Sequence, residues 1–390
     1  MAADLDRESL KSAASDCIDS CGNELNQISG EIWRNPEVGF EEYKAHDLLT
    51  GFLERKGFSV ERSYTGIETA FRATFGSGRP NVCVICEYDA LPEIGHACGH
   101  NLIAEAGVAA GLGLKAALES SNAPKGRVTV MGTPAEETIG GKITLLKNGS
   151  FEDVDIAMMV HPAPYSVLKT QFIACREWKV TYTGKAAHAA AFPWEGVNAL
   201  DAAVMAYSSI SVLRQQMKPD HSVHGVITNG GAKPNIIPEK TSMEYFIRAP
   251  TRDEVDAFCK KVCACFEAAA EATGCRLEIE ESPSYDNMKS NDILAKIYLQ
   301  NYKVLGRDMM EEMREIGSTD MGNVSYAVPS IHPMYKIGTG EVYHTRDFTS
   351  ITNTPEAHAE TLLAAKAMAH TCIDVLTTDR LLEEIKSKFL

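Results

Sequence analysis

The sequence predicts an α/β protein: a domain with a mixed, mostly parallel β-sheet, interrupted by an inserted ferredoxin-like α+β domain. In the first part of the chain, buried strands alternate with helical segments, which is the rhythm of an α/β sheet. Beyond Cys175 the order becomes β-α-β-β-α-β, the split unit of ferredoxin-like domains. Because α/β patterning resumes after Asn291, we expect one domain to comprise residues 1–175 and 288–390, with the insertion at 176–287.

The first domain begins with helices and continues with strands that are each followed by a polar loop. Apolar residues recur at helical spacing over residues 8–57, on both sides of a loop that contains Pro36, and a further helix is expected at 102–120. The expected strands are residues 71–75, 81–87, 127–132 and 155–160, the last of which ends at His161. Ligands of an α/β sheet collect at the carboxyl ends of its strands, so we expect a site in the loops that follow.

The insertion and the end of the chain are also periodic. An alternating strand is expected at residues 177–183, with further strands at 222–228, 242–248 and 276–280. An amphipathic helix is expected at 198–215 and another helix at 252–272. A long final helix is expected to begin at Thr354-Pro355-Glu356, since threonine caps helices and proline suits their first turn.

Charge and cysteine usage narrow the class of protein. The 390 residues carry 38 Lys and Arg against 53 Asp and Glu, a net charge of −15, with no run rich in Lys and Arg. This balance argues against nucleic-acid and anionic membrane partners, and no apolar run approaches the roughly 18 residues of a membrane-spanning helix. Met1 to Arg7 lack the features of a secretory signal or transit peptide. The 11 scattered cysteines are therefore expected to be reduced thiols in the cytoplasm.

Four segments concentrate residues that bind metals, three of them at the ends of predicted strands and one in a glycine-bearing loop near the end of the chain. They are Glu87-Tyr-Asp-Ala-Leu-Pro92 with His96-Ala-Cys-Gly-His100, then Pro134-Ala-Glu-Glu-Thr138, His161, and Glu341-Val-Tyr-His344. Cys98 and His100 can face one ion, and thiolate plus imidazole suits zinc or a neighbouring transition metal. In the pair Glu136-Glu137, one carboxylate can bind metal while the other activates a water. Each signal alone has an ordinary structural explanation, but their convergence at strand ends indicates a metal site.

Two other patterns are better explained by packing. Cys83-Val-Ile-Cys86 lies in an apolar strand, whose alternation points the two thiols to opposite faces. Gly111-Leu-Gly-Leu-Lys-Ala116 resembles a dinucleotide fingerprint but lies inside a predicted helix, where close helix packing explains it. The sequence contains no G-x-S-x-G, Walker or H-E-x-x-H motif, so serine hydrolase, P-loop and thermolysin-like mechanisms have no support.

The insertion supplies candidates for holding a carboxylate. Thr183-Gly-Lys-Ala-Ala-His188 places an imidazole after a strand and a glycine turn, Asn235 ends a glycine loop, and Arg248 ends a strand. Arginine offers a carboxylate a bidentate contact, which asparagine and histidine can supplement. Near the end of the chain, the hydroxyls of Gly317-Ser-Thr-Asp-Met-Gly322, including Ser318, either contact substrate or form a turn.

Seven segments, spread over nearly the whole chain, carry a family resemblance. They are Arg34-Asn-Pro-Glu-Val-Gly-Phe-Glu-Glu42, Glu87-Tyr-Asp-Ala-Leu-Pro92, His96-Ala-Cys-Gly-His100, Pro134-Ala-Glu-Glu137, Gly184-Lys-Ala-Ala-His188, Asn235-Ile-Ile-Pro238 and Gly317-Ser-Thr-Asp320. In this order they resemble the aminoacylase and metallodipeptidase superfamily, and most of all its amidohydrolase branch with the animal β-alanyl-lysine (Xaa-Arg type) dipeptidases.

The resemblance implies a two-metal hydrolase with a catalytic α/β domain and an inserted lid domain, through which a homodimer is expected. The divalent ions would be zinc, manganese, cobalt or nickel, bridged by the Cys98 thiolate. The resemblance implies that the other metal ligands are His100, Glu137, His161 and His344.

The resemblance also implies the residues that act on the substrate. Glu136 would be the general base, and His188 would polarise the scissile carbonyl or hold the substrate. Asn235 and Arg248 would contact the terminal carboxylate of the substrate, with Ser318 as a further contact. Many relatives have His-x-Asp where this chain has Glu87-Tyr-Asp89; the change is typical of the Cys-x-His branch and leaves Asp89 as a candidate for supporting a ligand.

The expected activity is hydrolysis of the amide bond of a small dipeptide, with a β-alanyl or similar amino-terminal residue and a carboxy-terminal Lys, ornithine or Arg. Another substrate of the same chemistry is an N-acyl or aryl amino-acid conjugate such as aminobenzoyl-glutamate. Two alternatives belong to other classes: a cysteine-nucleophile amidase that uses Cys98 with His96 or His100, and a non-catalytic relative that binds a ligand or a partner.

Overall fold

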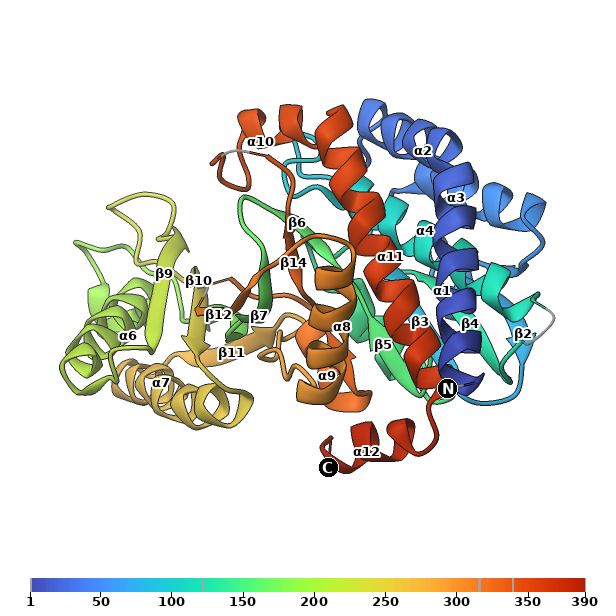
Figure 1. Ribbon diagram of the computed structural model, residues 1–390. Coiled ribbons are helices and arrows are strands. Elements are labelled where there is room, and N and C mark those ends of the chain that lie inside the picture. Colours follow the sequence, from blue (N-terminus) through green and yellow to red (C-terminus); the bar gives the residue numbers. More distant parts are fainter. Residues whose placement is uncertain (1, 121–122, 315–316, 339, 390) are drawn as a thin grey trace. The chain divides into compact units, whose positions relative to one another are not determined.

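The computed structural model describes residues 2–120, 123–314, 317–338 and 340–389 (Figure 1). The chain divides into two compact units. Unit 1 comprises Met1–Gln171, Met288–Glu315 and Asp320–Leu390, and unit 2 comprises Phe172–Asn287 and Ile316–Thr319.

Unit 1 is built on a six-stranded sheet with the order β1-β2-β4-β3-β5-β13. The strands are β1 (Ser59–Arg62), β2 (Phe71–Ser77), β3 (Asn81–Cys86), β4 (Gly126–Gly132), β5 (Ile156–Met158) and β13 (Ser330–Ile331). β4, β3, β5 and β13 run parallel to one another, whereas β1 pairs with β2 and β2 with β4 in antiparallel fashion. The expectation of a mixed, mostly parallel sheet is therefore confirmed.

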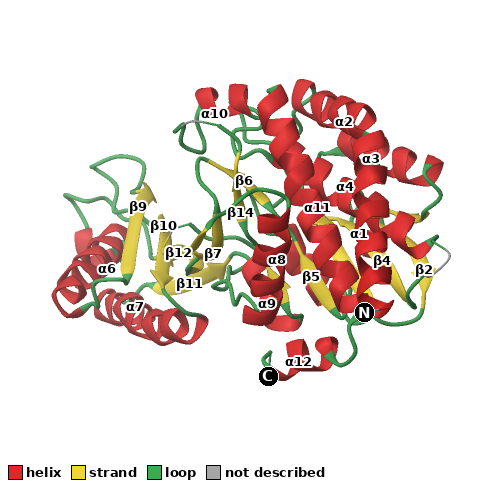
Figure 2. Ribbon diagram, viewed as in Figure 1, coloured by secondary structure: helices red, strands yellow, loops and turns green. Residues whose placement is uncertain are grey.

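Helices surround this sheet (Figure 2). They are α1 (Ala2–Ser20), α2 (Gly22–Arg34), α3 (Tyr43–Arg55), α4 (His100–Leu118), α5 (Gly141–Lys147), α8 (Asp292–Val304), α9 (Met321–Ala327), α10 (Arg346–Ile351), α11 (Pro355–Thr377) and α12 (Leu381–Ser387), with a short 3-10 turn at Tyr64–Gly66. The Thr354 side chain caps α11 by accepting a hydrogen bond from the Ala357 amide, and Pro355 occupies the first turn, as the sequence predicts.

The helix α4 lies at the centre of unit 1 and packs against α1, α11 and β3. A Cβ on Gly111 would lie 2.3 Å from Val130 Cγ2, so this glycine lets α4 approach β4 closely, in agreement with the packing interpretation. By length and composition α4 resembles a membrane span, although Asn101 and Glu105 interrupt its apolar residues. Of its most apolar stretch of 18 residues, 83% is buried within the protein, as in the core helix of a globular unit.

Unit 1 also contains a second, four-stranded sheet, which the sequence pattern did not predict. It has the order β12-β7-β14-β6, formed by β6 (His161–Ala163), β7 (Val167–Gln171), β12 (Met310–Arg314) and β14 (Met334–Lys336). The expectation of one strand over residues 155–160 is wrong at its end, because β5 stops at Met158 and His161 begins β6. The amides of Met159 and His161 bond to Ile331 and Pro333, so the chain bends from one sheet into the other.

Unit 2 has the predicted ferredoxin-like arrangement. Its strands are β8 (Ala174–Thr183), β9 (Ser222–Asn229), β10 (Lys240–Ala249) and β11 (Arg276–Glu281), in the order β11-β8-β10-β9, with every neighbouring pair antiparallel. Its helices are α6 (Ala199–Leu213) and α7 (Arg252–Thr273), with 3-10 turns at Pro193–Glu195 and Arg214–Gln216. Side chains of Asn198 and Thr251 cap the two helices, and Gly274 ends α7 with a φ of 75°. Inward residues of the strands form one apolar core with both helices.

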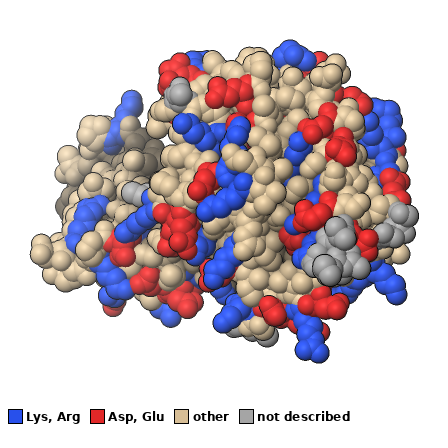
Figure 3. All heavy atoms as spheres, in the orientation of Figure 1, with Lys and Arg blue, Asp and Glu red and all other residues tan. Residues whose placement is uncertain are grey.

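Charged residues are mixed on the surface. On the face shown in Figure 3, Lys and Arg side chains are interspersed with Asp and Glu.

Candidate active site

The site in unit 1 is built on the loop that joins β3 to α4. Gly99 has a φ of 82° and precedes the first residue of α4, His100. A Cβ on Gly99 would lie 2.5 Å from Pro162 Cγ. The turn therefore requires glycine, and it brings Cys98 and His100 beside the segment that carries His161.

The predicted metal ligands form two groups that share one thiol. Cys98 Sγ lies 3.5 Å from His161 Nε2. The ligand atoms of Cys98, His100 and His161 all lie within 4.8 Å of one another, and so do those of Cys98, Glu137 and His344. Ligand atoms from four separate segments of the chain thus meet around the Cys98 sulfur.

His344 reaches this position through an unusual backbone conformation. Its φ is 60°, in the left-handed region that few residues other than glycine adopt. Its amide donates a hydrogen bond to the Ala97 carbonyl, and its Nε2 lies 3.3 Å from Glu137 Oε1. The first contact ties the loop near the end of the chain to the Cys98 loop, and the second ties it to the segment that carries Glu137.

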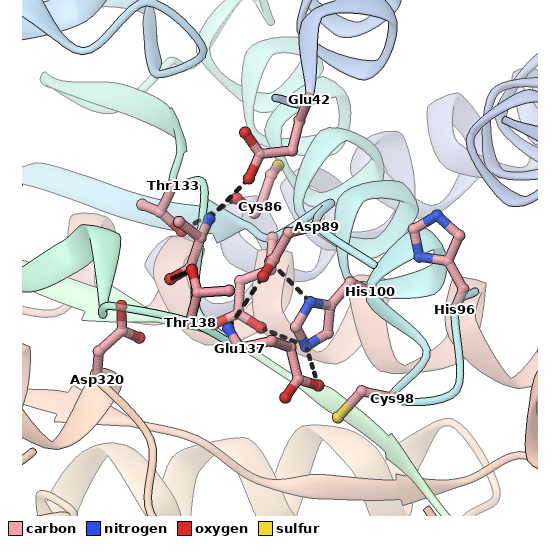
Figure 4. Close-up of polar contacts among 12 residues, drawn as sticks. Glu42, Cys86, Asp89, His96, Cys98, His100, Thr133, Glu137, Thr138 and Asp320 are labelled. Carbon is pink, nitrogen blue, oxygen red and sulfur yellow. Dashed lines mark hydrogen bonds and ion pairs between the residues drawn. The ribbon is translucent and has the colours of Figure 1, made fainter. Parts of the chain in front are cut away.

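Asp89 holds two of the predicted ligands in place. Its Oδ1 lies 2.9 Å from His100 Nδ1, and its Oδ2 accepts a hydrogen bond from the Glu137 amide (Figure 4). Burial opposes ionisation of Asp89, but His100 and the hydrogen bonds outweigh burial and hold the pKa of Asp89 below its ordinary value. An ionised Asp89 only accepts, so His100 carries a proton on Nδ1, and Nε2 is the ring atom left to bind a metal.

A buried ion-pair network lies behind the predicted ligands. Lys142 Nζ lies 2.5 Å from Glu87 Oε1 and 2.7 Å from Asp320 Oδ1, and the Lys142 amide donates to Asp320 Oδ2. All three side chains are buried. Glu87 Oε2 faces His100 Nε2 at 3.4 Å. Glu87 is thus held by a buried lysine.

Sequence reasoning missed Lys142 altogether and treated Asp320 only as part of a polar loop. The double glycine before Lys142 was the one available signal. A Cβ on Gly141 would lie 1.8 Å from the Pro134 carbonyl oxygen, so the glycine lets the start of α5 press against the segment that carries Glu136.

Glu136 lies among carboxylates. A carboxylate oxygen of Glu136 is within 4.8 Å of ligand atoms of Glu87 and Asp320, and also of His100 and Glu137. Burial, followed by the negative charge of Glu87, raises the pKa of Glu136 well above its ordinary value. Such a carboxyl group binds protons readily.

His96 does not join the group. Its ring points away from Cys98 in Figure 4, and its Nε2 lies 3.1 Å from the Ile32 carbonyl oxygen. Burial, followed by the negative charge of Glu137, raises the pKa of the Cys98 thiol well above its ordinary value. A nucleophilic cysteine needs a lowered pKa, so this environment does not favour a Cys98–His96 amidase.

Unit 2 carries the four remaining candidates. Arg248 donates a hydrogen bond to Ser318 Oγ at 3.1 Å, and the Ser318 hydroxyl donates to the Ile173 carbonyl. His188 and Asn235 lie on two paired loops, since the Ala189 amide donates to the Asn235 carbonyl. The structure thus joins these residues into two pairs within the unit.

The His188 ring has a defined tautomer. Its Nδ1 accepts hydrogen bonds from the amides of Ala190 and Ala191 at 3.3 and 3.1 Å. Because Nδ1 accepts, Nε2 carries the proton in the neutral ring and is free to donate.

Known proteins resemble the chain throughout its length. Residues 176–274 match the peptidase dimerisation domain of the M20 family. The chain is 47% identical to the Xaa-Arg dipeptidase of Mus musculus, over 98% of this chain and 92% of the mouse protein. It is 30% identical to one of the subunits of the p-aminobenzoyl-glutamate hydrolase of Escherichia coli, over 96% of this chain and 93% of that protein.

Solved structures share the fold. A putative aminohydrolase from methicillin-resistant Staphylococcus aureus has a TM-score of 0.79 at 20% identity, covering 94% of this chain and all of that one. A dinuclear metal-binding peptidase of the M20 family from Bacillus subtilis has a TM-score of 0.71 at 19% identity, covering 92% of this chain and 99% of that one. The match to the mouse protein, at 47% identity over nearly the full length of both chains, decides the family. The chain belongs to the M20 peptidase family, among the relatives of the Xaa-Arg dipeptidases.

Proposed function

We propose that this chain hydrolyses the amide bond of small dipeptides whose carboxy-terminal residue is Lys, ornithine or Arg and whose amino-terminal residue is β-alanyl or similar. The observation that carries the proposal is the shared thiol of Cys98, which belongs both to the group with His100 and His161 and to the group with Glu137 and His344. The 47% identity to a protein named Xaa-Arg dipeptidase supports the choice of substrate.

The donor atoms suit two divalent ions. One group offers sulfur and two imidazoles, and the other offers sulfur, a carboxylate and an imidazole. His100 Nε2 and Glu137 Oε1 are buried and make no hydrogen bond among the described residues, and each lies at ion-pair distance from another side chain of this cluster, as expected of atoms that share a metal. Soft and borderline donors of this kind suit zinc, with manganese, cobalt and nickel as further candidates. Bound ions would polarise the scissile carbonyl and lower the pKa of a water.

Glu136 is the proposed general base. It lies next to the ligand Glu137 in the chain, and its carboxylate lies within 4.8 Å of ligand atoms of both Glu137 and His100. It would take a proton from the attacking water and deliver that proton to the leaving amine.

The residues of unit 2 are proposed to hold the substrate. Arg248, with its guanidinium placed by Ser318, would bind the terminal carboxylate together with Asn235. His188 has its donor at Nε2 and would stabilise the developing negative charge on the carbonyl oxygen.

A homodimer through unit 2 is also proposed. β9 forms an edge of its sheet. Exposed apolar residues gather on α6 and β9, namely Val204, Met205, Tyr207, Val212, Val226 and Ile227. An edge strand and an apolar helix face are surfaces that a second copy can cover, and the match to a peptidase dimerisation domain supports this. Light scattering of the purified protein measures the oligomeric state directly.

The reducing cytoplasm is the proposed location, because a bridging thiolate must stay reduced. All 11 cysteines are free. Oxidation of Cys98 would remove a ligand from both groups.

Assays on β-alanyl-lysine and aminobenzoyl-glutamate, with and without a chelator, test the proposal. We expect hydrolysis of β-alanyl-lysine that the chelator abolishes and that added zinc, manganese or cobalt restores. Preferential hydrolysis of aminobenzoyl-glutamate would favour the second candidate function, which is supported by the 30% identity to the Escherichia coli hydrolase. Full activity in the presence of chelator would contradict a metal-dependent mechanism and favour the thiol amidase.

A further inference from the structure

The sheet of unit 2 has one face that its own helices leave uncovered. α6 and α7 pack on the face that carries Trp178, Tyr245 and Ile247. The alternate residues project to the opposite face, which no helix of unit 2 covers within the described residues. Figure 1 shows both helices on the same side of β9 and β10. Because no helix of unit 2 packs on this face, a ligand can contact the side chains that project from it.

Three side chains on this uncovered face form a compact set: Glu177 on β8, and Phe246 and Arg248 on β10. Phe246 lies directly opposite Glu177 in the antiparallel register, and Arg248 lies opposite Cys175. Glu177 and Arg248 are therefore diagonal neighbours, about 7 Å apart and on the same face. The Arg248 guanidinium lies over the Phe246 ring, 5.5 Å from its centroid.

The two opposite charges do not neutralise each other. Arg248 bonds to Ser318, and no ion pair joins Arg248 to Glu177. Within the described part of the chain, the half-buried Glu177 carboxylate has no cation at ion-pair distance and makes no hydrogen bond. A half-buried anion without a cation is costly, and a bound cation would relieve that cost. Burial, followed by the charge of Glu244, raises the pKa of Glu177, which reflects the same environment.

The set is complementary to one kind of amino-acid residue. A guanidinium binds an α-carboxylate, an aromatic ring packs against methylene groups, and a carboxylate binds an ammonium or guanidinium. A carboxy-terminal lysine, ornithine or arginine carries an α-carboxylate, then methylene groups, then a cationic group, which match the three protein side chains in that order. A glutamate at the same place would bring its side-chain carboxylate against Glu177, so the set also disfavours acidic termini.

We infer that Glu177 is the residue that selects a basic carboxy-terminal side chain, with Phe246 beneath its methylene groups and Arg248 on its α-carboxylate. The inference rests on the proposed dipeptidase function and adds a specificity-determining residue to it.

The test compares β-alanyl-lysine with β-alanyl-norleucine, which keeps the methylene groups and lacks the charge. Glu177→Gln is expected to lower kcat/KM for the lysine peptide about 10- to 100-fold, the usual effect of losing a hydrogen bond to a charged group. The norleucine peptide is expected to change less than twofold, which also shows that the variant is folded. Glu278→Gln is the matched control, since Glu278 is an exposed glutamate on the same face, opposite Thr181, and it should leave both peptides unchanged.

The outcomes separate the inference from the proposed function. If the wild-type enzyme cleaves β-alanyl-lysine but Glu177→Gln keeps the lysine-to-norleucine ratio, the role of Glu177 is overturned and the dipeptidase function stands. An equal fall in kcat/KM for both peptides also overturns the role of Glu177. If the wild-type enzyme cleaves no basic dipeptide, the proposed function fails and the inference fails with it.

Discussion

The contact between Asp89 and His100 orients a predicted ligand of the metal centre. Asp89 Oδ1 lies 2.9 Å from His100 Nδ1, and both side chains are buried. The contact fixes the tautomer of His100, because an ionised carboxylate accepts only and so places the ring proton on Nδ1. Nε2 then keeps the lone pair that a metal ligand needs.

Replacing Asp89 tests this contact. Asp89→Asn can present an amide N–H to Nδ1 and so favour the wrong tautomer, with the proton on Nε2. We expect metal affinity to fall about 10- to 100-fold, the usual effect of losing a group that orients a ligand. Titration of the metal-free protein with cobalt, followed by absorbance, measures the affinity. Unchanged affinity would show that the contact does not control His100.

Glu136→Gln separates proton transfer from metal binding. We expect kcat to fall about a thousandfold, the size of a general-base contribution, while the metal content measured by elemental analysis stays at the wild-type level. Glu93→Gln, an exposed carboxylate on the loop after β3, should have no effect on either measurement. Near-normal turnover in Glu136→Gln would contradict the proposal that Glu136 is the general base.

The buried lysine behind the ligands is expected to contribute strongly to stability. Lys142→Met leaves the carboxylates of Glu87 and Asp320 without their cation, so the free energy of unfolding should fall by about 3 kcal/mol. Urea unfolding measures the change. Lys147→Met provides the control, because Lys147 is an exposed lysine on the same helix and should cost little. A loss no larger than the control would mean that the network does not stabilise unit 1.

The burial of His370 predicts that the stability of the fold depends on pH, independently of the metal centre. Its Nε2 lies 2.9 Å from Ser15 Oγ and 3.0 Å from the Lys11 carbonyl oxygen, and burial lowers the pKa of His370 to about 4. Between pH 6.5 and 4 the unfolded chain binds this proton and the folded chain does not, so stability falls as the pH falls.

The His370 contribution at pH 5, relative to pH 8, is about 2 kcal/mol. Urea unfolding of wild type and His370→Gln at both pH values measures it. The wild type should lose about that much more stability than the variant on acidification. Equal losses would show that His370 titrates alike in both states.

Much of the fold follows from local patterns in the sequence. The order of strand and helix patterns in unit 2 predicts the ferredoxin-like arrangement, and Thr354 with Pro355 marks the start of α11. The second sheet of unit 1 escaped prediction because β6 and β14 have three residues each, too few to show a period. His161 therefore lies at the start of a strand and not at the end of one.

Site residues whose type alone indicates their chemistry were predicted from the sequence. A residue whose role depends on its burial was missed. Cysteine, histidine and paired glutamates at strand ends indicate metal ligands by their chemistry, and the structure brings Cys98, His100 and Glu137 together. In the sequence, only the double glycine before Lys142 distinguishes this buried lysine from the exposed Lys147 five residues later. Only the packing of α5 against the Pro134 segment puts the first of them between two carboxylates.

Metal content of the wild type and of Cys98→Ser, measured by elemental analysis of the purified proteins, tests the shared thiol most directly. We expect two divalent ions per wild-type chain, since two ligand groups meet at this sulfur. Cys98→Ser should lose most of its content of both metal ions. Cys175→Ser, at a buried cysteine of unit 2, should keep both ions. Full metal content in Cys98→Ser, or a metal-free wild type that still cleaves its dipeptide, would contradict the two-metal centre.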